Sequence, residues 1–245
     1  MGTVVQFADL RAGVVDALRL LARSCAGQSV IRVGAEACEV EWSPDARHRH
    51  ALLLPLVLLT AAIDQGAARA RWSDVSFAEV VDAAHSLDLG EKDMLLALAG
   101  TGLPQAVVGA TEADAPARPG TPCRRVHFAR ELATWIERFD LAGRAVTVDR
   151  ERLASGAPGA HYGVRPVDLM REMPAVLKAL EPAQGLAALA VLALYNGSDA
   201  RAAFKGKRRA ALNPPAVEAF AALRRLAGEE AHAHLLRLVA AYRGW

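Results

Sequence analysis

Residues 182–197 read PAQGLAALAVLALYNG, and the eleven residues from Gly185 to Tyr195 carry no charged side chain. A membrane-spanning helix needs about 20 apolar residues, so this run is too short to cross a bilayer. The same holds for the thirteen residues from Ala51 to Ile63, which include Pro55. We therefore interpret both stretches as helices buried in the core of a protein that does not enter a membrane.

The composition of the whole chain favours helix. Alanine and leucine are frequent, aromatic residues make up only 5% of the sequence, and arginine is far commoner than lysine. The chain has 245 residues, of which 53% are hydrophobic and 23% charged, so it can bury a core without disulfides or a structural metal. These features predict a mainly α-helical protein with a bundle-like arrangement of several helices.

Individual helices are predicted from apolar residues at three- and four-residue steps and from capping residues at the ends of each pattern. Asn196 and Gly197 are interpreted as the C-terminal stop of the apolar helix, and Gly228 as the break between the last two helices. The predicted helical ranges are Phe7–Arg23, Ser43–Ile63, Ser76–His85, Glu91–Ala99, Arg124–Leu141, Pro166–Leu180, Pro182–Tyr195, Pro214–Ala227 and Glu229–Arg243.

One short segment departs from the helical period. Within Val30–Trp42, apolar residues alternate with glutamates after Gly34, which predicts a small β-hairpin near the N-terminus. A short strand is also predicted at Ala145–Val148. The range Ser155–Pro166 holds three glycines and two prolines, and we predict a loop there.

A change of composition suggests a division of the chain. Residues 104–122 are rich in Ala and Gly and contain four prolines, which indicates a linker or a long surface loop. It would separate a helical N-terminal lobe with the hairpin, residues 1–103, from a helical C-terminal lobe, residues 123–245. The alternative is one continuous domain.

Charge is distributed unevenly along the sequence. Residues 1–122 carry ten basic and fifteen acidic side chains, whereas residues 196–245 carry nine basic and four acidic ones. The basic residues of this last part form the candidate site for nucleic acid or another anion: Arg201, Lys205, Lys207, Arg208, Arg209, Arg224 and Arg225. The alternative is a solvated basic segment that complements the acidic N-terminal half.

The sequence contains no familiar catalytic or metal-binding motif. Its three cysteines are widely spaced, and none of its seven histidines belongs to a His-Glu-x-x-His pattern. Glu229 and His232 have the spacing that places two metal ligands on one helical face, and Asp82 and His85 repeat it, but a di-metal helical bundle needs further glutamates. Cys123 and His127 form only a weak candidate for a catalytic pair. We expect no metal, no cofactor and no catalytic residue.

These observations lead to three functional hypotheses. The first is a non-catalytic cytoplasmic interaction, assembly or regulatory protein, whose partner is another protein or a second copy of the chain. We expect a cytoplasmic location because no secretory signal is found. The second is a protein that binds DNA or RNA through residues 201–209. The third is a helical enzyme whose catalytic residues are scattered over several helices.

Overall fold

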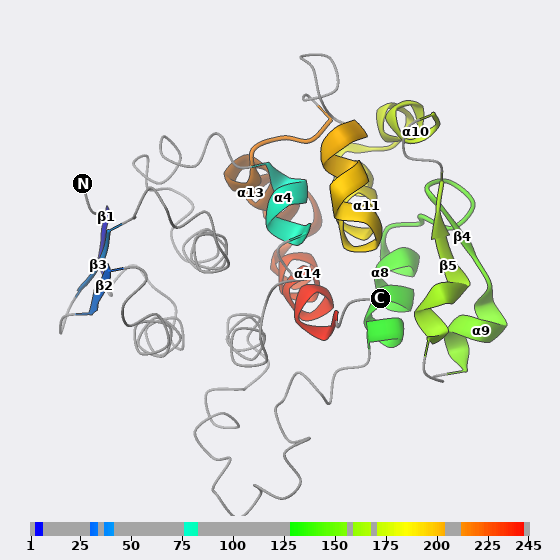
Figure 1. The fold of residues 1–245 in the computed structure, drawn as a ribbon, viewed down its shortest axis with the longest axis horizontal. Helices are drawn as coiled ribbons and strands as arrows, with labels where there is room; N and C mark the ends of the chain where they lie inside the picture. Colours follow the sequence, from blue (N-terminus) through cyan, green and yellow to red (C-terminus); the bar gives the residue numbers. More distant parts are fainter. Residues whose placement is uncertain are drawn as a thin grey trace, which may run out of the picture.

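The computed structural model describes residues 3–6, 30–33, 37–41, 76–82, 128–155, 159–167, 171–203 and 212–242. Helices dominate these ranges, which confirms the predicted mainly helical fold (Figure 1). None of the helices described there is long and apolar enough to cross a membrane. Seven α-helices lie in the described ranges: α4 (Phe77–Asp82), α8 (Phe128–Arg138), α9 (Arg150–Ala154), α10 (Met173–Ala179), α11 (Pro182–Ala203), α13 (Ala216–Ala227) and α14 (Glu229–Ala241).

The end of α11 differs from the prediction. Asn196 and Gly197 do not stop this helix, which continues to Ala203. A glycine inside a helix costs only about 1 kcal/mol relative to alanine, and residues 186–194 of the same helix are all buried, so the packing outweighs the local stop signal. At Gly228, by contrast, the predicted break is confirmed, since this residue has a φ of +84° and separates α13 from α14.

Two antiparallel sheets occur in the described residues. Near the N-terminus, β2 (Val30–Val33) and β3 (Ala37–Glu41) pair antiparallel, and β1 (Thr3–Gln6) adds to β3, so that the strand order is β1-β3-β2. In the middle of the chain, β4 (Val146–Val148) pairs with β5 (Val164–Pro166).

This central sheet and the segment that follows it correct three predictions. The predicted fold class contains a hairpin only near the N-terminus, and the sequence predicts a loop over residues 155–166. In the structure, that range includes the 3₁₀-helix η4 (Ala160–Gly163) followed by β5. A helix is predicted to begin at Pro166, but this residue ends β5 and α10 begins only at Met173. Local composition fails here because the strand is held by its partner β4, which lies far from it in sequence.

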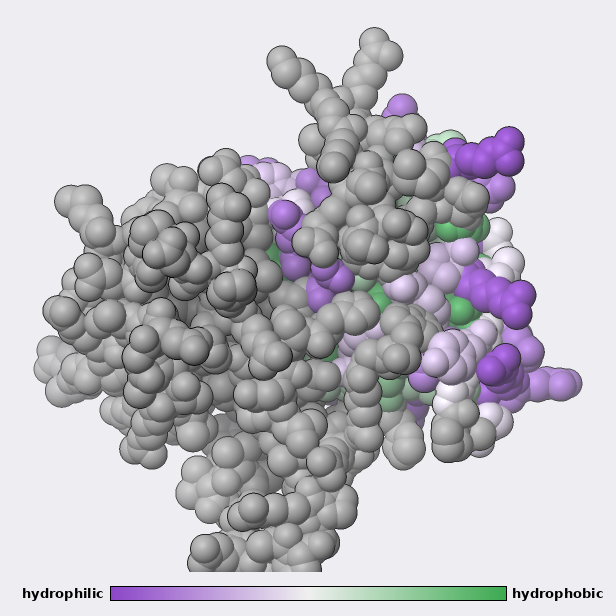
Figure 2. Space-filling model, viewed as in Figure 1, coloured by the Kyte–Doolittle hydropathy of each residue, from purple (hydrophilic) through white to green (hydrophobic). Residues whose placement is uncertain are grey.

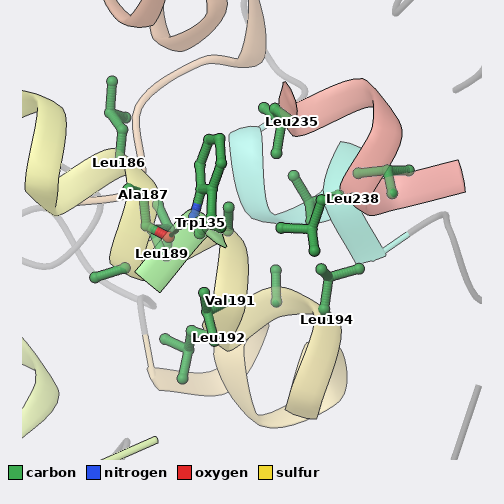
Figure 3. Packing of buried hydrophobic residues seen from close by; sticks show 14 of the residues in the cluster. Trp135, Leu186, Ala187, Leu189, Val191, Leu192, Leu194, Leu235 and Leu238 are labelled. Carbon is green, nitrogen blue, oxygen red and sulfur yellow. Dashed lines mark hydrogen bonds between the residues drawn. The ribbon is translucent and has the colours of Figure 1, made fainter. Parts of the chain in front are cut away.

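The core is built around α11. Leu186, Leu189, Val191 and Leu194 are buried, which confirms that this apolar run is core. Trp135 of α8 is fully buried against it, and its indole Nε1 donates a hydrogen bond of 3.1 Å to the carbonyl oxygen of Ala187. Figure 3 shows this indole among leucines contributed by α11 and α14.

The short helix α4 also belongs to this core. It packs against α11 and α13, and the ring of Phe77 meets that of Phe220 at 5.2 Å in an edge-to-face arrangement. The backbone N–H of Phe77 donates to the carbonyl of Pro214 at 2.9 Å, and that of Ala78 to the Asn213 side chain at 3.0 Å. A segment of the predicted N-terminal lobe thus packs directly on the C-terminal helices.

Several predicted elements lie outside the described residues. They are the helices Phe7–Arg23, Ser43–Ile63 and Glu91–Ala99, the linker 104–122, and the second apolar run Ala51–Ile63. The predicted division of the chain at 104–122 stays a prediction.

Candidate functional site

A tight junction between α9 and η4 forms one side of a surface pocket. Asp149 caps α9 by accepting a hydrogen bond of 3.1 Å from the backbone N–H of Arg152, and its own N–H donates to the carbonyl of Gly163 at 2.7 Å. A Cβ atom on Gly163 would lie 2.9 Å from the carbonyl oxygen of Asp149 and 3.2 Å from the nitrogen of Leu153. Only glycine therefore allows the two elements to approach this closely.

The same junction holds the ring of Tyr162 at the surface. Gly159 precedes η4 with a φ of +79°, and a Cβ atom there would lie 2.9 Å from the ring of Tyr162. The ring centroid of His161 is 4.4 Å from that of Tyr162, and the guanidinium carbon of Arg152 lies 5.6 Å from the Tyr162 centroid. Tyr162 nevertheless remains 43% exposed.

The pocket itself has a volume of about 390 Å³. Four of the described elements contribute to it: α9, η4, β5 and α11. Its lining residues are Arg152, Tyr162, Val164, Arg165, Pro166 and Tyr195. We call this the Arg/Tyr pocket, because two arginines and two tyrosines make up most of its wall.

The pocket is positively charged. Within the described ranges, no acidic side chain lines it, and neither Arg152 nor Arg165 forms an ion pair. Both arginines are exposed at the surface. Figure 2 shows that hydrophilic residues gather on this side of the molecule, over the region of β4, β5 and α9.

Tyr195 connects the pocket to the central helix. Its hydroxyl donates a hydrogen bond of 2.6 Å to the carbonyl oxygen of His161, which ties α11 to η4. Burial, with a smaller contribution from Tyr242, raises the pKa of Tyr195 far above the ordinary tyrosine value, so the hydroxyl stays protonated as a donor. Burial also lowers the pKa of His161, and the nearby charge of Arg152 lowers it further.

The basic residues predicted from the sequence lie elsewhere. Arg201 is in the last turn of α11, and Lys205, Lys207, Arg208 and Arg209 lie outside the described residues. Arg224 and Arg225 are in the last turn of α13. The Nε atom of Arg224 donates to the carboxylate of Glu229 at 2.9 Å, whereas Arg225 is exposed. Neither Arg224 nor Arg225 lines the Arg/Tyr pocket.

The candidate metal ligands are also separated. The side chain of Glu229 is 59% exposed and pairs with Arg224, whereas His232 is buried, with its ring 5.7 Å from that of Phe220. Across the described ranges, no three His, Cys, Asp or Glu side chains gather as a metal site would require. His85, Cys123 and His127 lie outside the described residues.

Sequence reasoning missed the four aromatic and cationic residues of the pocket. Tyr162 and Arg165 lie in Ser155–Pro166, which is predicted from composition to be a loop, and Tyr195 is interpreted as part of the core. Arg152 lies between the predicted strand and this loop, where no element is predicted. The sequence did contain one signal for this site. Gly159 and Gly163 flank Tyr162, and an arginine lies on either side of this segment, Arg152 before it and Arg165 after it. Comparisons with protein-family models, curated proteins and solved structures found no match to this chain.

Proposed function

We propose that the protein is a non-catalytic interaction protein that binds an anionic partner at the Arg/Tyr pocket. The observation that carries this proposal is the presence of two exposed guanidinium groups, Arg152 and Arg165, in one pocket, neither of which forms an ion pair with a described residue. Arginine presents several N–H donors in a planar fork, which matches both oxygens of a carboxylate or phosphate.

The electrostatic conditions of the pocket favour this role. Like charges without a counter-ion repel one another, so bringing two arginines to one pocket offers little stability to the fold itself. An anion bound between them removes that repulsion and gains charge-assisted hydrogen bonds. Because neither side chain forms an ion pair with a described residue, an arriving ligand does not have to break one.

Two kinds of anionic partner fit this function. An acidic protein segment, including the acidic N-terminal half of a second copy, would support a role in assembly or regulation. A nucleic acid is the second candidate, and a specific observation favours it: Arg201 follows Tyr195 on the same helix, and residues 205–209 add four more basic side chains.

Charge reversal tests the proposal. The variant R152E/R165E reverses both pocket arginines, and K178E/R144E reverses two exposed cations that do not line the pocket. We expect the wild type and the control to bind inorganic polyphosphate with a Kd of roughly 10⁻⁴ to 10⁻⁶ M at physiological salt, and R152E/R165E to lose that binding.

Thermal melts of all three proteins establish that each variant is folded. Equal binding by R152E/R165E and the wild type would refute the proposal, as would a wild type that does not bind polyphosphate. If binding survives in R152E/R165E and disappears only when residues 205–209 are reversed, the anion site is the basic segment and not the pocket.

A further inference from the structure

Tyr162 is an unusual residue for a folded surface. Among the described residues, only Tyr162 and Leu226 are large hydrophobic side chains that remain exposed, at 43% and 48%. Tyr162 differs from Leu226 in lying in a pocket, beside two cationic side chains. Its ring therefore presents an aromatic surface within reach of a ligand that the arginines attract.

The position of this ring is well defined by its surroundings. The backbone at Gly159, the ring of His161 and the guanidinium of Arg152 all contact or approach it. The hydrogen bond from Tyr195 to the carbonyl of His161 anchors the same turn to α11. A ring held in place before binding loses little conformational entropy when a planar group stacks on it.

A planar ring next to two guanidinium groups matches the chemistry of a nucleotide. Bases stack on exposed aromatic side chains, and phosphates accept hydrogen bonds from arginine. A volume of about 390 Å³ is within the usual range for small-ligand pockets. An acidic peptide would use the arginines, but its carboxylates have no planar ring system to stack on the tyrosine.

The sequence that follows Tyr195 favours a nucleic-acid strand over a free nucleotide as the ligand. Tyr195 lines the pocket, and Arg201 follows six residues later, which is a rise of about 9 Å along a helix. Lys205, Lys207, Arg208 and Arg209 come next in the sequence. In the sequence, five basic residues thus follow the last residue of the pocket, which is more than the phosphate of a single nucleotide requires.

We propose that the Arg/Tyr pocket binds one nucleotide of a single-stranded nucleic acid, with its base stacked on Tyr162 and its neighbouring phosphates held by Arg152 and Arg165. This inference rests on the proposed function, because it names the anionic partner of the same pocket. It assigns separate roles to the ring and to the arginines, so the two parts can be tested separately.

The test uses the full chain and two labelled probes, a short oligothymidylate and an abasic strand of equal length. Both probes carry the same backbone charge, but only the first can stack. We expect Y162A to weaken oligothymidylate binding by about 5- to 150-fold, the effect of replacing a base-stacking aromatic by alanine. Y162F should bind as the wild type does, because it keeps the ring. The affinity for the abasic strand should be unchanged in both variants and abolished in R152E/R165E.

A second variant displaces the Tyr162 ring without removing it. In G159A, the added Cβ would lie 2.9 Å from the Tyr162 ring, so the ring must shift. We expect G159A also to weaken oligothymidylate binding more than abasic binding. Melting curves of every variant exclude unfolding as the cause.

The outcomes separate this inference from the proposed function. If Y162A binds oligothymidylate like the wild type while R152E/R165E loses polyphosphate, base stacking is refuted and anion binding stands. If the arginine reversal changes neither polyphosphate nor strand binding, both proposals fail. If thymidine monophosphate competes for the pocket as well as the strand does, a strand ligand is refuted. If polyglutamate binds more tightly than oligothymidylate, the partner is an acidic protein and not a nucleic acid.

Discussion

His234 and Glu131 join the last helix of the described chain to α8. The Nε2 atom of the buried His234 lies 3.0 Å from the backbone carbonyl oxygen of Glu131 and 3.3 Å from its carboxylate. The same carboxylate lies 3.4 Å from the Nε atom of Arg237, whose other end donates to Glu230 at 2.8 Å. Trp135 packs edge-on against the imidazole at 5.2 Å. This contact therefore couples the core to a titratable group.

The first prediction concerns pH. Burial lowers the pKa of His234 below its ordinary value of 6.5, although the backbone and carboxylate of Glu131 oppose this effect. The unfolded chain therefore binds a proton more readily than the folded one, and stability that is present above pH 6.5 is lost as the pH falls toward the folded pKa. We expect the Tm to decrease between about pH 7.5 and about pH 5.

A glutamine variant isolates this effect. H234Q keeps a donor for the Glu131 carbonyl but does not titrate, so its Tm should fall less steeply over the same pH range. His161 also has a lowered pKa and contributes to the remaining slope. Identical slopes for H234Q and the wild type would show that His234 does not control the acid sensitivity.

The second prediction concerns the apolar core. Leu189 is fully buried in α11, and L189A should lower the free energy of unfolding by about 2–5 kcal/mol because it leaves a cavity. L226A makes the same chemical change at an exposed position of α13 and should alter stability by no more than about 0.5 kcal/mol. Urea titrations followed by circular dichroism measure both values. Equal effects of the two changes would contradict the assignment of α11 to the core.

The third prediction compares two glycines. G163A places a Cβ atom 2.9 Å from the Asp149 carbonyl oxygen, and the resulting strain should destabilise the protein by about 1–3 kcal/mol. In G185A the nearest atom is the carbonyl oxygen of Leu177 at 3.7 Å, and the residue is helical. That substitution should stabilise by about 0.4–1 kcal/mol. Chemical denaturation measures the free energy of unfolding of both variants. A G163A variant more stable than the wild type would mean that α9 and η4 are not in close contact.

The fourth prediction concerns the basic segment after α11. If a single strand extends from the pocket along residues 201–209, reversing Lys205, Lys207, Arg208 and Arg209 to Glu should weaken oligothymidylate binding. The slope of log affinity against log salt should become shallower by about 0.7 for each phosphate that the variant no longer neutralises. Titrations at several salt concentrations measure this slope. An unchanged slope would show that these four residues do not contact the strand and that the interaction is restricted to the pocket.

Periodicity and capping residues determined much of the helical part of this protein. The ranges of α13 and α14 and the break at Gly228 follow from local signals, because a helix is stabilised by contacts between residues three and four apart. The burial of residues 186–194 follows from their apolar composition. The binding role of residues 201–209 stays a prediction, since most of that segment lies outside the described residues.

Only the tertiary structure decided the pairing of β4 with β5 and the pocket beside it. Val164 is held as a strand by pairing with Val148, sixteen residues earlier, and no local pattern near 164 indicates that partner. Arg152, Arg165 and Tyr195 come together because this pairing folds α9 onto η4 and the Tyr195 hydroxyl fastens η4 to α11. The continuation of α11 beyond Gly197 also depends on packing, since burial of its apolar part outweighs the local preference to stop. Local interactions thus determined where most of the described helices form, whereas contacts between distant residues determined the Arg/Tyr pocket.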